Sequence, residues 1–168
     1  MLEIFNVLKP FFDDCYGEIS VREYSRLMGM SAPTASVWLK MYESEGLLKR
    51  REDRGYMFFR ADRDSDILRD LSRIYWKIEL TKVVNEIRTE LHNPTIVLFG
   101  SLSKLEAKKD SDIDIAIISK TAKKINLENF EKQLGRRIQV FYFKSFGEIS
   151  DELRINIING YVLGGRLE

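Results

Sequence analysis

This chain has few cysteines and almost no net charge, and each of these features narrows the class of protein. Cys15 is the only cysteine among 168 residues, so no disulfide can form within the chain, which is typical of the reducing cytoplasm. The 27 Lys and Arg residues nearly balance the 26 Asp and Glu residues, for a formal net charge of +1. The overall charge therefore gives no general attraction to nucleic acid or membrane, and such binding would need a local basic patch.

Long hydrophobic runs are also absent. No apolar stretch approaches the roughly 20 residues that a membrane-spanning helix requires. Residues 1–12 are apolar but carry Glu3 and lack a basic start and a cleavage site, which predicts a core helix instead of a signal peptide. We therefore expect a soluble, cytoplasmic protein without membrane contact.

The first part of the chain, residues 1–62, has the pattern of short helices followed by a hairpin. One apolar stripe precedes Gly29, which suits a left-handed helix end, and another follows the predicted N-cap Ser31. The members of the two stripes are Val21, Tyr24, Leu27 and Met28, then Ala35, Leu39 and Tyr42. The runs "LLKRR" and "YMFFR" flank "EDRG" and predict a β-hairpin with Gly55 in its turn.

Helix, turn, helix and hairpin is the order of a winged helix-turn-helix, and "SAPTASVWLKMYESEGLLKRRE" resembles the second helix and wing of that family. The resemblance implies that this helix enters the major groove of double-stranded DNA. The implied DNA-binding residues are Thr34, Ser36 and Lys40 on the helix and Lys49, Arg50, Arg51 and Arg54 on the wing. Wing contacts with phosphates would give affinity but little sequence selectivity. The alternative is a solvated wing or a module that contacts protein.

Residues 63–91 contain no Gly or Pro and predict one long connecting helix or two helices in tandem. Apolar residues follow steps of four, three and four in two sets, Ile67, Leu71, Ile74 and Ile78, then Leu80, Val84, Ile87 and Leu91. A core face is the favoured interpretation, and pairing with a second copy in a homodimer is the alternative.

From residue 92 onward the pattern alternates strands and helices. Strands are predicted at "TIVLF", "IDIAIIS" and "RIQVFYF", and helices at "NLENFEKQL" and "DELRINII". His92 precedes the first of these strands and is expected to be a surface or capping residue without a role. The expected fold is α+β in three parts, with a third domain at residues 92–168.

Residues 99–119, "FGSLSKLEAKKDSDIDIAIIS", combine a Gly-Ser pair with two closely spaced carboxylates. Gly100 follows a predicted strand, where glycine lets backbone N–H groups approach a phosphate. Asp112 and Asp114 alternate along a strand, so both carboxylates project from one face. Such a pair repels itself unless a cation lies between, and oxygen ligands suit Mg²⁺. The alternative is a surface loop with a solvated acidic strand end.

Gly-Ser, ten residues and Asp-x-Asp match the signature of the DNA polymerase beta nucleotidyltransferase superfamily. More narrowly, the chain resembles the minimal nucleotidyltransferases, because "SDIDIAII" and "LRINIINGYVLGG" are similar to their metal strand and their closing helix and strand. The resemblance covers about residues 70–168. It implies a mixed sheet flanked by helices and transfer of a nucleotidyl group from an NTP to an acceptor hydroxyl, with release of pyrophosphate.

The resemblance also assigns roles to individual residues. Asp112 and Asp114 would be catalytic and would hold Mg²⁺ or Mn²⁺, while Gly100, Ser101 and Lys104 would bind the phosphates. Relatives of this kind often act with a small helical partner protein, in some cases as the antitoxin of a pair.

Two positions depart from the family pattern. Leu105 stands where the family usually has a small residue, often Gly, and is expected to stiffen the loop and narrow the nucleotide pocket. Gln139 stands where the family commonly places a third carboxylate, and a neutral amide cannot act as a base. Glu128 and Glu131 would replace it only if their helix packs unusually.

Three functions remain open from the sequence. The first is a nucleotidyltransferase that binds NTP with Mg²⁺ and modifies a partner macromolecule, which the two aspartates favour. The second is a winged-helix regulator or antitoxin-like partner with a weakened nucleotidyltransferase domain, which Gln139 favours. The third is an enzyme that receives a 3′ end from its winged helix, and the single basic residue on the predicted recognition helix argues against it.

Overall fold

The computed structural model describes residues 3–121, 123 and 125–167, and the chain divides into two compact units. The first unit comprises Met1–Leu71 and Leu105–Lys109, and the second comprises Ser72–Lys104 and Asp110–Glu168. A short segment from the middle of the chain therefore belongs with the N-terminal unit. None of the helices among the described residues is long and apolar enough to cross a bilayer.

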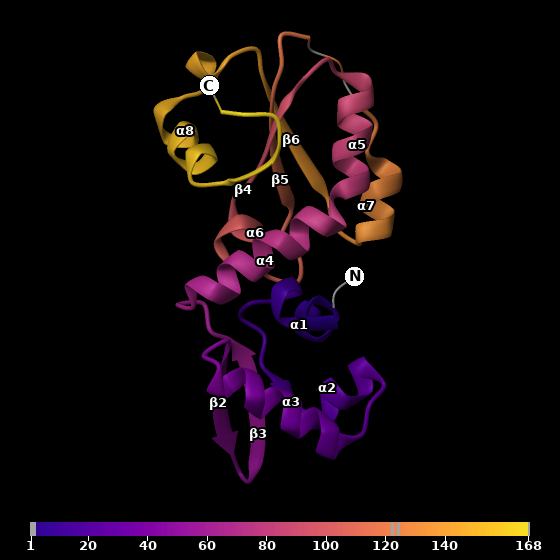
Figure 1. The fold of residues 1–168 in the computed structure, drawn as a ribbon, viewed down its shortest axis with the longest axis vertical. Helices are drawn as coiled ribbons and strands as arrows, with labels where there is room; N and C mark the ends of the chain where they lie inside the picture. Colours follow the sequence, from indigo (N-terminus) through magenta and orange to yellow (C-terminus); the bar gives the residue numbers. More distant parts are fainter. Residues whose placement is uncertain (1–2, 122, 124, 168) are drawn as a thin grey trace. The chain divides into compact units, whose positions relative to one another are not determined.

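The described residues of the first unit form three complete helices and a three-stranded antiparallel sheet of order β1-β3-β2 (Figure 1). Its elements are α1 (Glu3–Asp13), β1 (Ile19–Ser20), α2 (Val21–Met28), α3 (Ala32–Ser44), β2 (Leu48–Asp53) and β3 (Tyr56–Ala61). The predicted helices and hairpin are thus present. Residues 1–2 of the predicted first helix lie outside the described residues.

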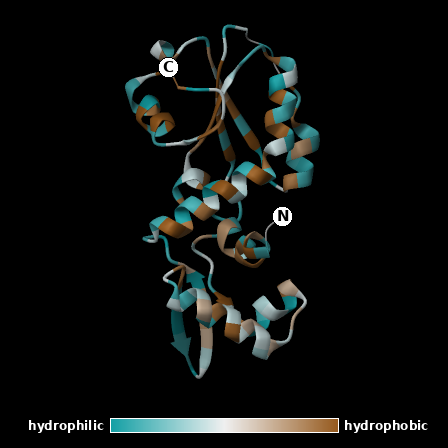
Figure 2. Cartoon of the chain, in the orientation of Figure 1, coloured by the Kyte–Doolittle hydropathy of each residue, from teal (hydrophilic) through white to brown (hydrophobic). Residues whose placement is uncertain are grey.

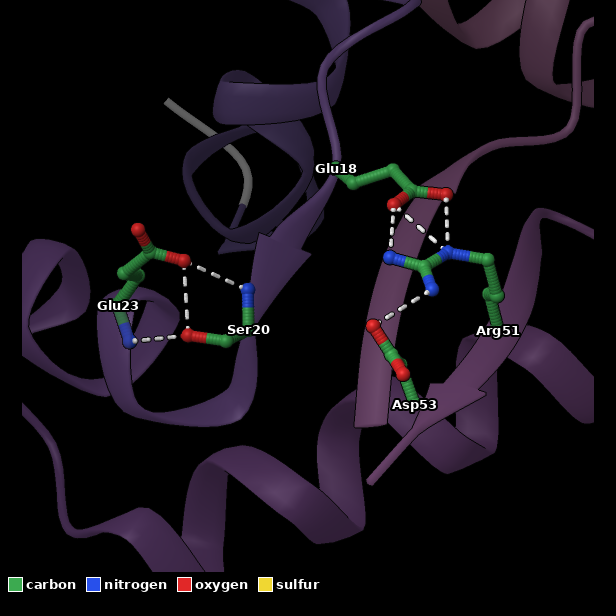
Figure 3. Close-up of polar contacts among 5 residues, drawn as sticks. All are labelled: Glu18, Ser20, Glu23, Arg51 and Asp53. Carbon is green, nitrogen blue, oxygen red and sulfur yellow. Dashed lines mark hydrogen bonds and ion pairs between the residues drawn. The ribbon is translucent and has the colours of Figure 1, made fainter. Parts of the chain in front are cut away.

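Local signals explain where these elements begin and end. Ser20 and Glu23 form a capping box at the start of α2 (Figure 3), and Gly29 ends the helix with a left-handed φ of 63°. Ser31 caps α3 by accepting a hydrogen bond from the Thr34 N–H, as the sequence predicted. One expected core residue is wrong, because the side chain of Leu27 is 65% exposed.

The connecting segment forms two helices in tandem, α4 (Asp66–Glu79) and α5 (Thr81–Glu90). The core interpretation is confirmed for the second apolar set, Leu80, Val84, Ile87 and Leu91, all of which are buried. It is wrong for the first set, in which Ile67 is 65%, Ile74 41% and Ile78 37% exposed.

A different face of α4 is buried, and its large side chains are Leu68, Tyr75 and Trp76. Helix α4 therefore has two apolar stripes, either of which could have formed its buried face. The stripe with the two aromatic rings is buried because those rings remove more apolar area from water.

The second unit is built on a mixed four-stranded sheet of order β6-β5-β4-β7. Its further elements are β4 (Thr95–Phe99), α6 (Ser101–Lys104), β5 (Ile113–Ile118), α7 (Glu128–Leu134), β6 (Ile138–Phe143), η1 (Phe146–Glu148), α8 (Asp151–Ile158) and β7 (Tyr161–Gly164). Strands β5 and β6 are parallel, and the other two pairs are antiparallel. The resemblance implied this mixed sheet, and the described residues confirm it.

Helix α8 covers one face of this sheet, whereas α5 and α7 lie on the other side (Figure 1). Under α8 the core contains Val97, Phe99, Ala116, Ile149 and Ile157. Figure 2 shows the apolar character of the central strands as brown ribbon. Since Asp112, Asp114 and Ala116 alternate along one strand face, the two aspartates continue this face beyond the core.

Candidate functional site

The two aspartates lie at the start of β5, where the strand emerges from the core. Asp112 immediately precedes the strand and Asp114 is its second residue, and both side chains are half-buried. Asp114 pairs in register with Phe99, the last residue of β4. The chain therefore turns away at Gly100 directly beside the carboxylate of Asp114.

Gly100 is required at this position by two independent features. Its φ of +71° lies in the left-handed region that favours glycine. A Cβ atom there would also overlap Oδ2 of Asp114 and lie 3.2 Å from its Cγ. The sequence predicted a glycine that lets phosphate approach the backbone, and the structure adds that this glycine makes room for a carboxylate.

The electrostatics of the pair favour a bound cation. Burial, together with the nearby charge of Asp112, raises the pKa of the Asp114 carboxyl above its ordinary value. Within residues 3–121, 123 and 125–167, no ion pair involves either aspartate. Their mutual repulsion is therefore not relieved by a side chain of the described residues.

Gln139 lies directly beside Asp114, because the two residues are partners in the parallel pairing of β5 and β6. Its side chain is exposed, whereas that of Ile138 is buried. Partners across a parallel pair share a face, so the amide lies on the face of the aspartates. This is the position that the sequence comparison gave to the missing third carboxylate.

The two glutamates considered as substitutes do not complete the site. Glu131 accepts a hydrogen bond from the Ile138 N–H at 2.7 Å through Oε1, which ties its carboxylate to the backbone of β6. Glu128 lies in the first turn of α7. Among the described residues, no cluster of three or more His, Cys, Asp or Glu side chains is suited to hold a metal ion. Within the described part of the chain, the aspartate pair therefore belongs to no three-residue cluster of this kind.

The residues after Gly100 form a short helix, α6, where the sequence analysis expected a loop. The Ser103 hydroxyl donates to the Gly100 carbonyl at 2.9 Å, and Arg73 Nε donates to the Ser103 carbonyl at 2.9 Å. These bonds hold the turn that contains Ser101. A run of four residues is too short for a helical period to be read from the sequence.

Lys104, the last residue of α6, has a neutral partner. Its ammonium group donates to Asn156 Oδ1 of α8 at 2.8 Å. Among the described residues no carboxylate is paired with Lys104, so its positive charge stays available. Asn156 was missed by the sequence analysis, since nothing in "DELRINII" distinguishes it from a surface residue.

Leu105 follows with a left-handed φ of +60°, although its side chain is buried. Such a backbone costs a residue with a Cβ about 1–2 kcal/mol, which is the physical reason for a glycine here. Leu105 begins the segment that belongs to the first unit, where the Cys15 N–H donates to the Ala107 carbonyl at 2.8 Å. That Leu105 narrows a nucleotide pocket stays a prediction.

In the first unit, most of the predicted wing cations are paired with carboxylates. Arg51 donates from Nε and Nη2 to Glu18 at 2.9 and 2.8 Å and lies 3.5 Å from Asp53 (Figure 3). The hydrogen bond from Arg51 lowers the pKa of the Glu18 carboxyl. The further ion pairs are Lys49 with Asp62 and Asp64, at 2.7 and 2.6 Å, and Arg50 with Glu43, at 3.2 Å.

Only part of the predicted DNA-binding set is exposed and unpaired. On α3, Thr34 and Lys40 are exposed and Ser36 is half-buried. Among the described residues, Lys40 and Arg54 take part in no ion pair. Val37, on the same helix, is 66% exposed, so the surface of α3 is more apolar than basic.

The second unit thus combines a mixed sheet, a Gly-Ser turn and two neighbouring carboxylates. The family model of the nucleotidyltransferase domain matches residues 80–163, half of the chain. The chain therefore belongs to the nucleotidyltransferase domain family, whose general function is nucleotidyl transfer. No curated protein was found to match it.

Proposed function

We propose that the second unit binds an NTP together with Mg²⁺ and transfers its nucleotidyl group to a hydroxyl group of a partner macromolecule. The observation that carries the proposal is the pair Asp112 and Asp114 beside the Gly100 turn, since neither carboxylate forms an ion pair with a described side chain. Mn²⁺ would fit the same oxygen ligands.

The donor set suits a metal that arrives with its nucleotide. Mg²⁺ is commonly bound by one or two carboxylates, and the remaining ligands are water and substrate phosphates. Asp112 and Asp114 would hold it, and the ion would neutralise charge that develops on the phosphates. The raised pKa of Asp114 supports this assignment, because burial and the nearby charge of Asp112 disfavour the ionised carboxylate and a bound cation would stabilise it.

The remaining groups would position the phosphates. The backbone N–H groups at Gly100 and Ser101 would donate to the outer phosphate oxygens. Lys104 would add a positive charge, which its bond to the neutral Asn156 aims without cancelling. These residues bind and orient the substrate, and none of them accepts a proton.

Deprotonation of the acceptor is the weak step in this site. Gln139 can accept a hydrogen bond from the acceptor hydroxyl through its carbonyl but cannot take its proton. The proton would leave to solvent, or to a carboxylate that the partner supplies. We therefore infer slow transfer by the chain alone, which leaves an antitoxin-like regulator with a weakened domain as the alternative.

The test is incubation of the chain with each labelled NTP, Mg²⁺ or Mn²⁺, and a host lysate. We expect one NTP to label a single acceptor, or the chain itself, and Asp112→Asn to abolish the labelling. Labelling of equal intensity by Asp112→Asn would contradict the proposal. Titration calorimetry with ATP and Mg²⁺ separates loss of binding from loss of transfer in that variant.

A second function is favoured by the order of elements in the first unit. Helix α1, strand β1, helices α2 and α3 and the β2–β3 hairpin follow each other as in a winged helix-turn-helix, and we propose that this unit binds duplex DNA weakly and with little sequence selectivity. Because three of its cations are paired, phosphates would have to displace carboxylates. Absence of binding to any duplex at low salt would remove this function.

The homodimer and the small helical partner protein stay predictions. The exposed isoleucines of α4 leave the dimer alternative open, and light scattering of the purified chain measures it directly.

A further inference from the structure

A cavity of about 760 Å³ lies in the second unit at the end of β5 remote from the aspartates. Its lining includes Ser119 and Lys120, which directly follow β5, whereas Asp114 is at the start of that strand. At about 3.3 Å per residue, the strand separates the two places by roughly 20 Å. The cavity is therefore distinct from the nucleotidyltransferase site.

The charge of this cavity is positive. Lys120, Lys144 and Arg166 line it together with His92, and no Asp or Glu is among its described lining residues. In the described part of the chain, none of these three cations has a carboxylate partner. Glu148 adds one negative charge nearby, where its carboxylate accepts a hydrogen bond from the backbone N–H of Lys144 at 2.9 Å. Three positive charges against this one leave the surroundings of the cavity positive.

The position of the cavity in the sheet also suits a ligand. The parallel strands β5 and β6 both end at it, and in open sheets ligands commonly bind outside the carboxyl ends of parallel strands. Hydroxyl groups line it as well, from Ser119, Thr121 and Ser145. Its volume falls within the roughly 300–1,000 Å³ of small-molecule sites.

We propose that this cavity binds the phosphate group of a small ligand, either a nucleotide or free pyrophosphate, without a metal ion. Lys120, Lys144 and Arg166 would form charge-assisted hydrogen bonds to the phosphate oxygens. The hydroxyl groups around them would donate further bonds. The proposal does not depend on nucleotidyl transfer, because it uses none of the residues of that site.

His92 provides a specific readout, since it is the only histidine of the chain and lines the cavity. The experiment is proton NMR of the full chain in EDTA, with AMP and pyrophosphate titrated separately. We expect the imidazole signals of His92 to shift and saturate. The ligand that saturates at the lower concentration identifies the source of the phosphate.

Matched variants assign the response to the cavity. The double variant Lys120→Ala, Lys144→Ala should weaken binding by about tenfold or more, because two charge-assisted bonds are lost. The control Lys82→Ala, Lys132→Ala removes equal charge from exposed positions on α5 and α7 and should bind as wild type. If the first double variant does not fold, Arg166→Gln tests the same site with one charge removed.

Asp114→Asn separates this proposal from the proposed function. The variant should lose Mg²⁺-dependent nucleotide binding but keep the His92 response in EDTA. The proposal is overturned if neither ligand shifts His92, or if the lysine variant and its control bind equally. It is also overturned if a single-stranded oligonucleotide binds at least tenfold more tightly than AMP, since the site would then serve a nucleic acid chain.

Discussion

In the first unit the basic side chains of β2 are paired with carboxylates, whereas in the second unit two carboxylates share one face at the start of β5 and neither forms an ion pair with a described side chain. Arg51 is held by Glu18 and Asp53, and Lys49 by Asp62 and Asp64. Burial, together with the nearby charge of Asp112, instead raises the pKa of the Asp114 carboxyl. The first unit thus pairs opposite charges, whereas the second unit places two like charges side by side.

This difference indicates which unit a charged ligand would stabilise more. Charges that are paired within a unit already have their electrostatic partners, so a ligand must displace those partners before it binds. A repelling pair of carboxylates is stabilised by any cation that enters, so ligand binding and relief of repulsion act in the same direction. Charge conflict at a half-buried position is therefore stronger evidence for a site than a basic surface.

The two carboxylates of the second unit repel each other in the folded chain only if the Asp114 carboxylate is held against the Gly100 turn. Gly100→Ala should lower the free energy of unfolding by at least about 2 kcal/mol, since it adds left-handed strain and an overlap with that carboxylate. Gly29→Ala is the matched control, because Gly29 has a similar φ of +63° but open space around it. It should cost only about 1 kcal/mol. Equal losses in urea denaturation would show that Asp114 is not fixed there.

A third carboxylate should increase the electrostatic repulsion at the candidate site and, with Mg²⁺ bound, raise the rate of transfer. Gln139→Glu or Gln139→Asp should raise the rate of labelling by at least about tenfold with Mg²⁺ present, because it restores a base and a metal ligand. The same variants should be less stable than wild type in EDTA, where three carboxylates then repel. If wild type is already fast and neither variant changes the rate, the role assigned to this position is wrong.

Removal of one carboxylate should stabilise the second unit. Because burial and Asp112 raise the pKa of Asp114, its ionisation destabilises the folded chain as pH rises above the unfolded value of about 3.9. Asp114→Asn should therefore melt at a higher temperature than wild type at pH 7 in EDTA, and this gain should disappear below about pH 4. A lower melting temperature at pH 7 would contradict the conflict inferred here.

The smallest expected effect concerns the ion pairs of the first unit. Glu18→Gln and Glu43→Gln should barely change stability, because exposed pairs contribute little. They should nevertheless raise affinity for duplex DNA at low salt and steepen its salt dependence by about one unit for each cation released. Unchanged affinity in the double variant would leave Arg50 and Arg51 without a role in DNA binding.

The sequence predicted those parts of the fold that short patterns determine. The β2–β3 hairpin, the capping residue Ser31 and the strands around the aspartates each carry a local signal, and all are present. The buried face of α4 was not predicted, because its two apolar stripes compete and only tertiary packing decides between them.

In the candidate site, too, the sequence predicted what local spacing determines and missed what tertiary contacts determine. The spacing of Asp112 and Asp114 indicated a shared face, and the register of Gln139 beside Asp114 agrees with its expected position. Helix α6 was missed because four residues are too few to show a helical period, and the Lys104–Asn156 bond was missed because its partners are 52 positions apart. The ion pair of Arg51 with Glu18 spans 33 positions and was invisible for the same reason.

Because Leu105–Lys109 belongs to the first unit, the boundary between the two units does not fall at one position in the gene. The loop that joins the Gly-Ser turn to the aspartates carries two buried side chains, Leu105 and Ala107, and the Ala107 carbonyl accepts a hydrogen bond from the Cys15 N–H. A fragment that contains only residues 72–168 would lose the hydrogen bond from the Cys15 N–H to the Ala107 carbonyl and the rest of the unit to which this loop belongs. The two units therefore cannot be exchanged between proteins as two simple sequence segments. A chimera with a different N-terminal unit would also need residues 105–109 that pack against that unit.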